Sequence, residues 1–411
     1  MAILHRTRNL TALVPRYTER FRCIGPACED TCCAGWYIRI DKKTYKAYRQ
    51  SDDAGMGDLL AQSVQREMQS SDANSYAHLI MRGEAQECNL MQDGLCSVHR
   101  TLGESYLPDT CFSYPRKTRM FAGQVEQGLT LSCPEAARQA LLAEDAFEFV
   151  EVPLAIRDGT LDQIKMRQGF PVEFMNDIRI FCLNVMQSRA LPIWQRLAIL
   201  GAFCENLSNA ARQERQATAP DLIEKFTHAV EDGSLSVALE AVQPQHAIQA
   251  TVFAALWAER GFTGLRVQEQ QVVDSIAANL GANVNGQTSA QSLVSSYVRG
   301  LERLDQVLAG APYLLENYLV NELFVRLFPF STSDIYIDYV ALVARFGLLR
   351  FMLAAQCNTS GALPSVDALV ATVQVYCRRF QHDSAYNSRI MQSLYDSGWT
   401  DLEKMYSFLR S

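Results

Sequence analysis

The stretch that decides the fold is Cys23-Ile-Gly-Pro-Ala-Cys28-Glu-Asp-Thr-Cys32-Cys33, near the start of a chain of 411 residues. It places four cysteines close together, and a Gly-Pro pair lies in the first gap between them. Because Gly and Pro favour turns over regular helix, the segment is predicted to be a loop that points its thiols toward one centre. Such loops are typical of metal-binding domains, in which coordination bonds replace part of an apolar core.

The twelve cysteines of the chain are unevenly distributed. Eight precede residue 134, each close to a Gly, Pro or Asp that favours a turn: Cys23, Cys28, Cys32, Cys33, Cys88, Cys96, Cys111 and Cys133. The other four lie on apolar stripes at helical spacing and are predicted to be inert core residues: Cys182, Cys204, Cys357 and Cys377. In a reducing compartment, a dense group of thiols favours a metal or cluster site over disulfides.

The spacing of the eight early cysteines bears on which metal they bind. Structural zinc sites usually contain paired C-x2-C knuckles, which this sequence lacks, and an adjacent Cys32-Cys33 pair suits one tetrahedral ion poorly. A [4Fe–4S] cluster is larger, and thiolates from distant, irregular loops can reach its irons. We therefore predict a [4Fe–4S] cluster, with zinc as the alternative. Eight thiols exceed the four that one cluster needs, so the ligand set and a second metal site stay open.

Composition limits the class of protein. Hydrophobic residues make up 48% of the chain and charged residues 20%, which is typical of a globular protein with a sizeable core. The net charge of −7 argues against nucleic acid as a partner. The first fifty residues differ, because ten Lys/Arg against four Asp/Glu give them a local charge of +6.

The protein is predicted to be cytoplasmic and not inserted into a membrane. Its first twenty residues contain no apolar run of the length that a signal peptide needs. The longest apolar stretch, residues 339–355, is interrupted by Arg345 and Arg350. It is also shorter than the roughly 20 residues that span a bilayer. We therefore interpret it as a buried helix.

Turn and periodicity signals predict a mainly α protein in two domains. Residues 1–150 are expected to form a cysteine-rich α+β domain that binds the metal or cluster, and residues 151–411 a mainly helical domain. The expected elements are strands at 36–40, 124–131 and 147–152, helices at 134–144, 171–188 and 197–211, loops at 206–220 and 281–292, and helices again from residue 297 onward.

Several segments resemble a known family. Residues 21–25 (FRCIG), 28–33 (CEDTCC) and 35–41 (GWYIRID) resemble the opening signature of the bacterial flagellin lysine-N-methylases. The block from Cys88 to Pro115 is similar to a wider family of cysteine-cluster proteins described as zinc- or iron-chelating. Further segments that resemble the methylases are 315–321 (LENYLVN) and 328–330 (FPF), so the resemblance extends from about residue 17 to the end.

The resemblance implies an enzyme. Its expected activity is transfer of a methyl group from S-adenosylmethionine to lysine side chains of flagellin, dependent on an iron–sulfur cluster held by the early cysteines. Two alternatives stay open. One is a protein-binding module organised by zinc, and the other is an iron–sulfur redox or sensor protein without methylase activity.

No motif identifies the catalytic or donor-binding residues. The nearest approach to a Gly-rich cofactor loop is Gly261-Phe-Thr-Gly264, which has no buried strand before it. Aromatic side chains could attract a sulfonium and orient an amine. The candidates in the cysteine-rich part, taken as a class, are Tyr17, Trp36, Tyr45, Tyr48, Tyr106 and Tyr114.

Overall fold

The computed structural model describes residues 4–51, 55–69, 72–84, 86–164, 169–280 and 289–411. The chain forms two compact units. Unit 1 consists of Met1–Ala136, Phe149–Ile164 and Thr263–Gln268, and unit 2 of Ala137–Glu148, Lys165–Phe262 and Glu269–Ser411. The described strands all belong to unit 1, and unit 2 is helical, which confirms the mainly α fold with an N-terminal cysteine-rich α+β part. The domain division at residue 150 stays a prediction, and unit 1 takes segments from both sides of it.

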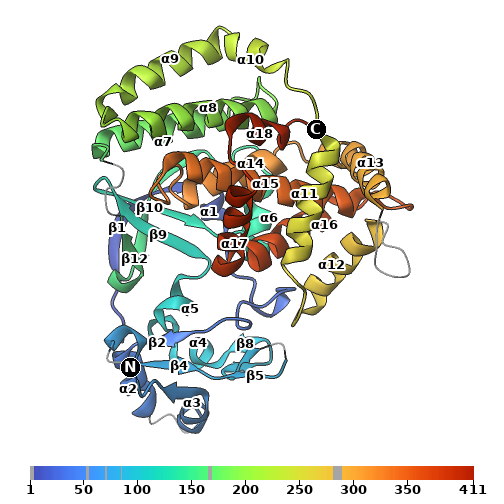
Figure 1. The fold of residues 1–411 in the computed structure, drawn as a ribbon. Coiled ribbons are helices and arrows are strands. Elements are labelled where there is room, and N and C mark those ends of the chain that lie inside the picture. Colours follow the sequence, from blue (N-terminus) through green and yellow to red (C-terminus); the bar gives the residue numbers. More distant parts are fainter. Residues whose placement is uncertain (1–3, 52–54, 70–71, 85, 165–168, 281–288) are drawn as a thin grey trace. The chain divides into compact units, whose positions relative to one another are not determined.

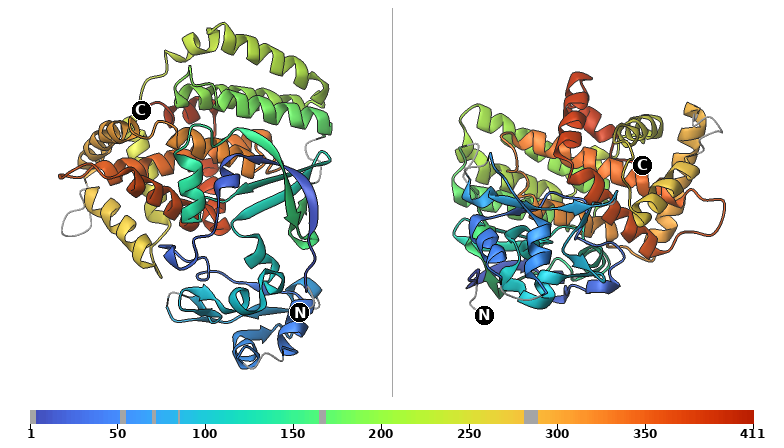
Figure 2. Two further views of the ribbon diagram at one scale, coloured as in Figure 1. Left: turned by 180° about the vertical axis from the view of Figure 1, so that it is seen from behind. Right: turned by 90° about the horizontal axis from the view of Figure 1, so that it is seen from below.

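The larger sheet of unit 1 has five strands in the order β11-β1-β10-β9-β12. These strands are β1 (Arg8–Pro15), β9 (Arg116–Phe121), β10 (Gln124–Leu129), β11 (Phe149–Ile156) and β12 (Leu161–Gln163). β1 lies between two strands that are distant in sequence, parallel to β10 and antiparallel to β11 (Figures 1 and 2). Its buried residues Ala12 and Val14 form a small core with Val125 and Ile156.

The rest of unit 1 is built from short elements around a second apolar core. The strands form a three-stranded sheet of β2 (Arg39–Ile40), β4 (Ala77–Leu79) and β3 (Val64–Arg66), and two two-stranded pairs, β5 (Met81–Arg82) with β6 (Glu87–Cys88) and β7 (Met91–Gln92) with β8 (Leu95–Cys96). The helices are α2 (Lys42–Arg49), α3 (Gly57–Ser63), α4 (Ser97–Leu102) and α5 (Asp109–Ser113). Side chains such as Ile40, Tyr48 and Leu79 form the buried centre of this core. The short helix α1 (Tyr17–Arg20) instead contacts β1 of the larger sheet.

The remaining described α-helices lie mostly in unit 2. They are α6 (Pro134–Leu141), α7 (Val172–Met186), α8 (Ile193–Arg212), α9 (Ala219–Glu231), α10 (Ser234–Leu239), α11 (His246–Glu259), α12 (Val267–Asn279), α13 (Ala290–Leu308), α14 (Leu314–Val325), α15 (Ile335–Cys357), α16 (Val366–Tyr376), α17 (Ser384–Asp396) and α18 (Leu402–Ser407). α15 packs against α8, α11, α13 and α16 (Figure 1). Gly300 of α13 permits the close approach to α15, because a Cβ there would clash with the carbonyl of Ala354.

Helix α15 contains the apolar stretch interpreted above as a buried helix. Among the described residues it is the one helix long and apolar enough to cross a membrane, and 83% of its most apolar window is buried inside the protein. Its two arginines have internal partners. Arg345 binds Glu322 at 3.1 Å, and Arg350 donates to the carbonyl of Phe408 at 2.6 Å. Burial with satisfied charges confirms the interpretation as a core helix.

The structure corrects several predicted boundaries. The strand predicted at 36–40 is formed only by Arg39–Ile40. β11 continues through Pro153 to Ile156, since it is the edge strand of its sheet and a missing N–H is tolerated there. α8 extends to Arg212, so the loop predicted at 206–220 is shorter. Most of the loop predicted at 281–292 lies outside the described residues.

Candidate metal centre

The Cys23–Cys33 loop is held by a turn and by pairing with a distant segment. A single 3-10 turn at Gly25–Ala27, in which Gly25 has φ +57°, follows Cys23. At the other end of the loop, the Cys33 carbonyl accepts a hydrogen bond from the Cys88 amide at 2.7 Å. The loop therefore runs beside β6, which brings Cys33 and Cys88 together.

Cys96 lies at the junction of a hairpin and a helix. The β7–β8 turn at Asp93-Gly94 has positive φ at both residues, as a tight hairpin requires. Cys96 then caps the N-terminus of α4, where the amides of Val98 and His99 face its thiol. Burial raises the pKa of Cys96, and these two N–H groups oppose that rise because they stabilise the thiolate.

Five early cysteines form one group in unit 1. Cys33, Cys88, Cys96 and Cys111 pack on the same apolar core. Burial raises the pKa of Cys111 well above its ordinary value, and the neighbouring thiols of Cys96, Cys88 and Cys32 raise it further. A hydrogen bond between the Cys32 and Cys33 side chains lowers the pKa of Cys32 and raises that of Cys33. Thiols this close repel one another once they are deprotonated, and a cation would relieve that repulsion.

The remaining three early cysteines are placed differently. Burial raises the pKa of Cys28 to about 11 and that of Cys133 to about 12, and the two thiols lie near each other and near Cys32. Cys133 directly precedes α6, with the amide of Ala136 facing its thiol. Cys23 is exposed.

The donor chemistry of the early cysteines fits a metal or iron–sulfur centre. Gathered thiols on loops are what either centre requires. In the part of the chain that the structure describes, however, no set of three or more His, Cys, Asp or Glu side chains is arranged to hold a metal ion. Ligation by the eight cysteines therefore stays a prediction.

Arg266 is a residue of this region that sequence patterns did not reveal. It belongs to the Thr263–Gln268 segment of unit 1. Its guanidinium donates to the carboxylate of Asp30 at 2.5 Å, to the carbonyl of Thr31 at 2.7 Å and to the carbonyl of Ala34. Its charge also helps to lower the pKa of Cys32. The one local signal was the Gly261–Gly264 turn before it.

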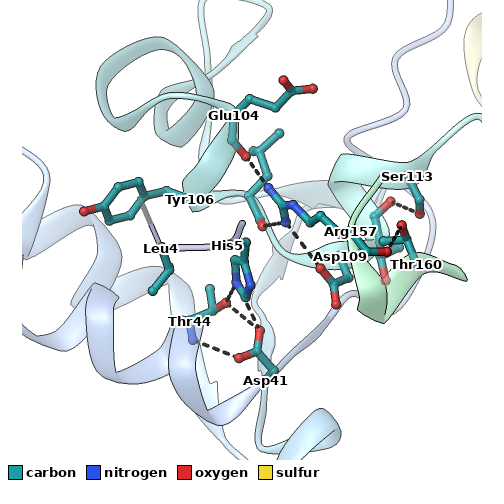
Figure 3. Close-up of polar contacts among 12 residues, drawn as sticks. Leu4, His5, Asp41, Thr44, Glu104, Tyr106, Asp109, Ser113, Arg157 and Thr160 are labelled. Carbon is teal, nitrogen blue, oxygen red and sulfur yellow. Dashed lines mark hydrogen bonds and ion pairs between the residues drawn. The ribbon is translucent and has the colours of Figure 1, made fainter. Parts of the chain in front are cut away.

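Another arginine of this region, Arg157, holds the segment that leads to Cys111. Arg157, which is 2% exposed, donates to the carbonyls of Glu104 at 2.6 Å and Leu107 at 2.8 Å. It also contacts the carboxylate of Asp109, the first residue of α5, at 3.3 Å (Figure 3). These contacts fix the turn before α5, and with it the position of Cys111.

The same region includes His5, close to the start of the chain. His5 Nε2 lies 2.7 Å from the Thr44 hydroxyl and 3.6 Å from the Asp41 carboxylate (Figure 3). Burial lowers the pKa of His5, and the nearby positive charge of Arg157 adds to this, although Asp41 opposes it. The lowered pKa favours the neutral imidazole of His5, which can hydrogen-bond to Thr44.

The six aromatic candidates separate into two groups. Trp36 and Tyr114 lie at the cysteine loop, where the indole N–H of Trp36 donates to the Cys32 carbonyl at 2.7 Å. The two rings meet edge-on, with their centroids 4.8 Å apart. The other four are occupied in packing or in hydrogen bonds to backbone groups: Tyr17, Tyr45, Tyr48 and Tyr106.

The four later cysteines are all buried, as predicted: Cys182 on α7, Cys204 on α8, and Cys357 and Cys377. Cys377 begins a π-helical turn at Cys377–Gln381 rather than lying within an α-helix, but it keeps its place in the core. Burial raises the pKa of Cys204 well above its ordinary value, so its thiol is protonated and unreactive.

Replacing Cys204 by serine is expected to reduce stability without affecting a metal site. Cys204 is 0% exposed, and a buried hydroxyl without a partner costs about 1–3 kcal/mol. The measurement is urea unfolding of Cys204→Ser beside Cys204→Ala, which removes the thiol without adding a hydroxyl. A serine variant as stable as the wild type would show that this site tolerates a polar group.

Comparisons with known proteins show the family. The family model of the FliB lysine N-methylase C-terminal domain matches residues 179–408. A lysine-N-methylase of Salmonella typhimurium is 24% identical over 394 residues, which cover 92% of this chain and 93% of the relative, and one of Salmonella choleraesuis gives the same values. The flagellar biosynthetic protein FliU of Salmonella muenchen is 31% identical over 145 residues, covering 35% of this chain and 85% of the relative. No solved structure matches. With the family model covering more than half of its length, the chain belongs to the FliB lysine N-methylase family.

Proposed function

We propose that this enzyme transfers a methyl group from S-adenosylmethionine to lysine side chains of flagellin. The observation that carries the proposal is the similarity to two lysine-N-methylases over 92% of the chain. Flagellin as the substrate is supported by the name of the family and by the relative described as a flagellar biosynthetic protein. The cytoplasmic location predicted from the sequence is part of this proposal.

The reaction sets a clear requirement on the site. A new N–C bond forms at the lysine Nζ while the C–S bond of the donor breaks, S-adenosylhomocysteine leaves, and one proton of the amine passes to a base or to water. A free lysine with a pKa of ~10.4 is neutral in only about one molecule in 2,500 at pH 7. The enzyme must therefore desolvate the amine or supply a base. Trp36 and Tyr114 are the aromatic candidates nearest the cysteine loop.

We further propose that the early cysteines bind a [4Fe–4S] cluster, with zinc as the alternative. The proposal is supported by the group of thiols around Cys33, Cys88, Cys96 and Cys111, which pack on one core and are carried by loops and short elements. A displacement at a sulfonium methyl does not itself need iron. The cluster would therefore supply a fixed arrangement of the surrounding loops, a role that a fully ligated cluster can fill.

Metal analysis and donor binding test the two parts together. Protein purified without oxygen should be brown and contain iron and sulfide if a cluster is bound, and colourless with zinc if the alternative holds. Titration with S-adenosylmethionine should show binding by the full chain. A brown protein that binds no methyl donor would favour a redox or sensor role instead.

Methylation of flagellin is expected when the two proteins are produced together. Each added methyl group should raise the mass of flagellin by about 14 Da, and peptide mapping should place it on lysines. The control is flagellin produced without this enzyme. If methyl-lysine on flagellin persisted unchanged after deletion of the gene from its own host, the proposed substrate would be wrong.

A further inference from the structure

We propose that Arg266 is a positioning residue that fixes the loop from Asp30 to Ala34, so that Cys32 and Cys33 face the other early thiols. The inference rests on the proposed metal centre, and it assigns a role to a residue far from the cysteines in sequence. It is carried by the geometry of one guanidinium and three of its acceptors.

The contacts of Arg266 are those of a preformed clamp. Its side chain is 12% exposed and that of Asp30 is 2% exposed, so the ion pair is shielded from water. The planar guanidinium also reaches the carbonyls of Thr31 and Ala34. A guanidinium presents several N–H donors in a fixed fork, so it can bind three acceptors at once. A lysine ammonium does this less well, because it is a compact point charge on a flexible stem.

The three acceptors flank the two cysteines on both sides. Asp30 and Thr31 precede Cys32, and Ala34 follows Cys33, so the clamp fixes the chain before and after the pair. Within the clamped segment, the Cys33 amide donates to the Thr31 hydroxyl at 3.1 Å. The backbone between Asp30 and Ala34 is therefore held at several points, which limits where the two thiols can point.

The residue that forms the clamp belongs to the part of the chain that matches the family model of the C-terminal domain. Arg266 lies 236 positions from Asp30 and within the range 179–408 that matches the C-terminal family model. Its segment nevertheless belongs to compact unit 1. The C-terminal part of the sequence thus contributes a residue to the cysteine-rich unit, and correct placement of Cys32 and Cys33 depends on it.

This placement also explains the Gly261-Phe-Thr-Gly264 stretch. Both glycines have φ +61°, a backbone conformation that other residues rarely adopt. The stretch lies between α11 and α12 and directly precedes the clamp. Its glycines therefore serve the turn that leads to Arg266, rather than a phosphate-binding loop of the Rossmann type.

The test uses full-length Arg266→Gln and Arg266→Lys, with Arg260→Gln as a matched control. Arg260 is also a half-buried arginine with a carboxylate and a carbonyl as partners, but these are Asp383 and Arg379 of the helical unit. Two quantities are measured: the rate at which a chelator removes iron from the purified protein, and the rate at which iodoacetamide alkylates each cysteine of the metal-free protein, followed by mass spectrometry.

In Arg266→Gln, both iron loss and alkylation of Cys33 should rise by on the order of tenfold, since charge-assisted hydrogen bonds contribute at that scale. Alkylation of Cys88 and Cys133 should stay unchanged. In Arg266→Lys, both rates should rise less than in Arg266→Gln, because the ammonium keeps the charge and part of the hydrogen bonding. Arg260→Gln should behave as the wild type does.

Unchanged alkylation of Cys33 in Arg266→Gln would overturn the proposal, and so would an equal rise at all cysteines, which would mean that Arg266 only stabilises the fold. If the wild type held neither iron nor zinc, the proposed metal centre would be wrong, while alkylation of Cys33 would still decide the role of Arg266.

Discussion

The double variant Cys96→Ser/Cys111→Ser is expected to lose its iron completely when purified without oxygen. The two thiols come from α5 and from the start of α4, and they lie within the same group as Cys33 and Cys88. A neutral serine hydroxyl is a poor ligand for iron in a cluster that requires thiolates. Iron and sulfide analysis, together with the visible absorption of the protein, provides the measurement.

A matched control separates loss of the metal from general damage. Cys204→Ser also replaces a cysteine by serine, but at a buried position on α8, and this variant should keep its full iron content. If the double variant retained full iron, Cys96 and Cys111 would be excluded as ligands. The proposal that the thiols grouped around Cys33 bind the cluster would then be wrong. If zinc were the metal, the same double variant should lose zinc instead.

Turn chemistry made the loops of the cysteine-rich part predictable. Gly25 and the Asp93-Gly94 pair all have positive φ, as expected where a chain must reverse sharply. The core positions of the later cysteines, such as Cys204, followed equally well from helical periodicity. In both cases the conformation depends mainly on interactions between residues that are close in sequence.

Contacts between distant segments could not be predicted in the same way. β1 is absent from the elements expected from the sequence, because its buried residues Ala12 and Val14 find their partners only on β10 and β11, far along the chain. Arg157 is buried and Arg266 half-buried, and both bind partners far away in the chain. An arginine in a sequence is normally interpreted as a solvated surface residue, and only the folded chain shows which ones bind carbonyls inside it.

The segment 315–321, which carried part of the family resemblance, has a structural role. It lies on α14, where Glu316 binds two arginines and the side-chain amide of Asn317 donates to the carbonyl of Ala143 at 2.9 Å. Resemblance of a motif to an enzyme family therefore does not by itself mark a catalytic residue. Here the motif joins helices of unit 2.

Replacing Glu316 by alanine is expected to destabilise the protein by about 3–5 kcal/mol, because it leaves a buried charge without its partner. Glu316 accepts from Arg196 at 2.6 Å and from Arg189 at 2.9 Å, and the side chains of Glu316 and Arg196 are 5% and 6% exposed. Urea unfolding of the full chain provides the measurement. Glu224→Ala is the control, since the side chain of Glu224 is 74% exposed on α9 and its loss should change the free energy of unfolding little. Equal stability of the two variants would show that Arg196 is satisfied by its backbone acceptors alone, the carbonyl of Met186 among them.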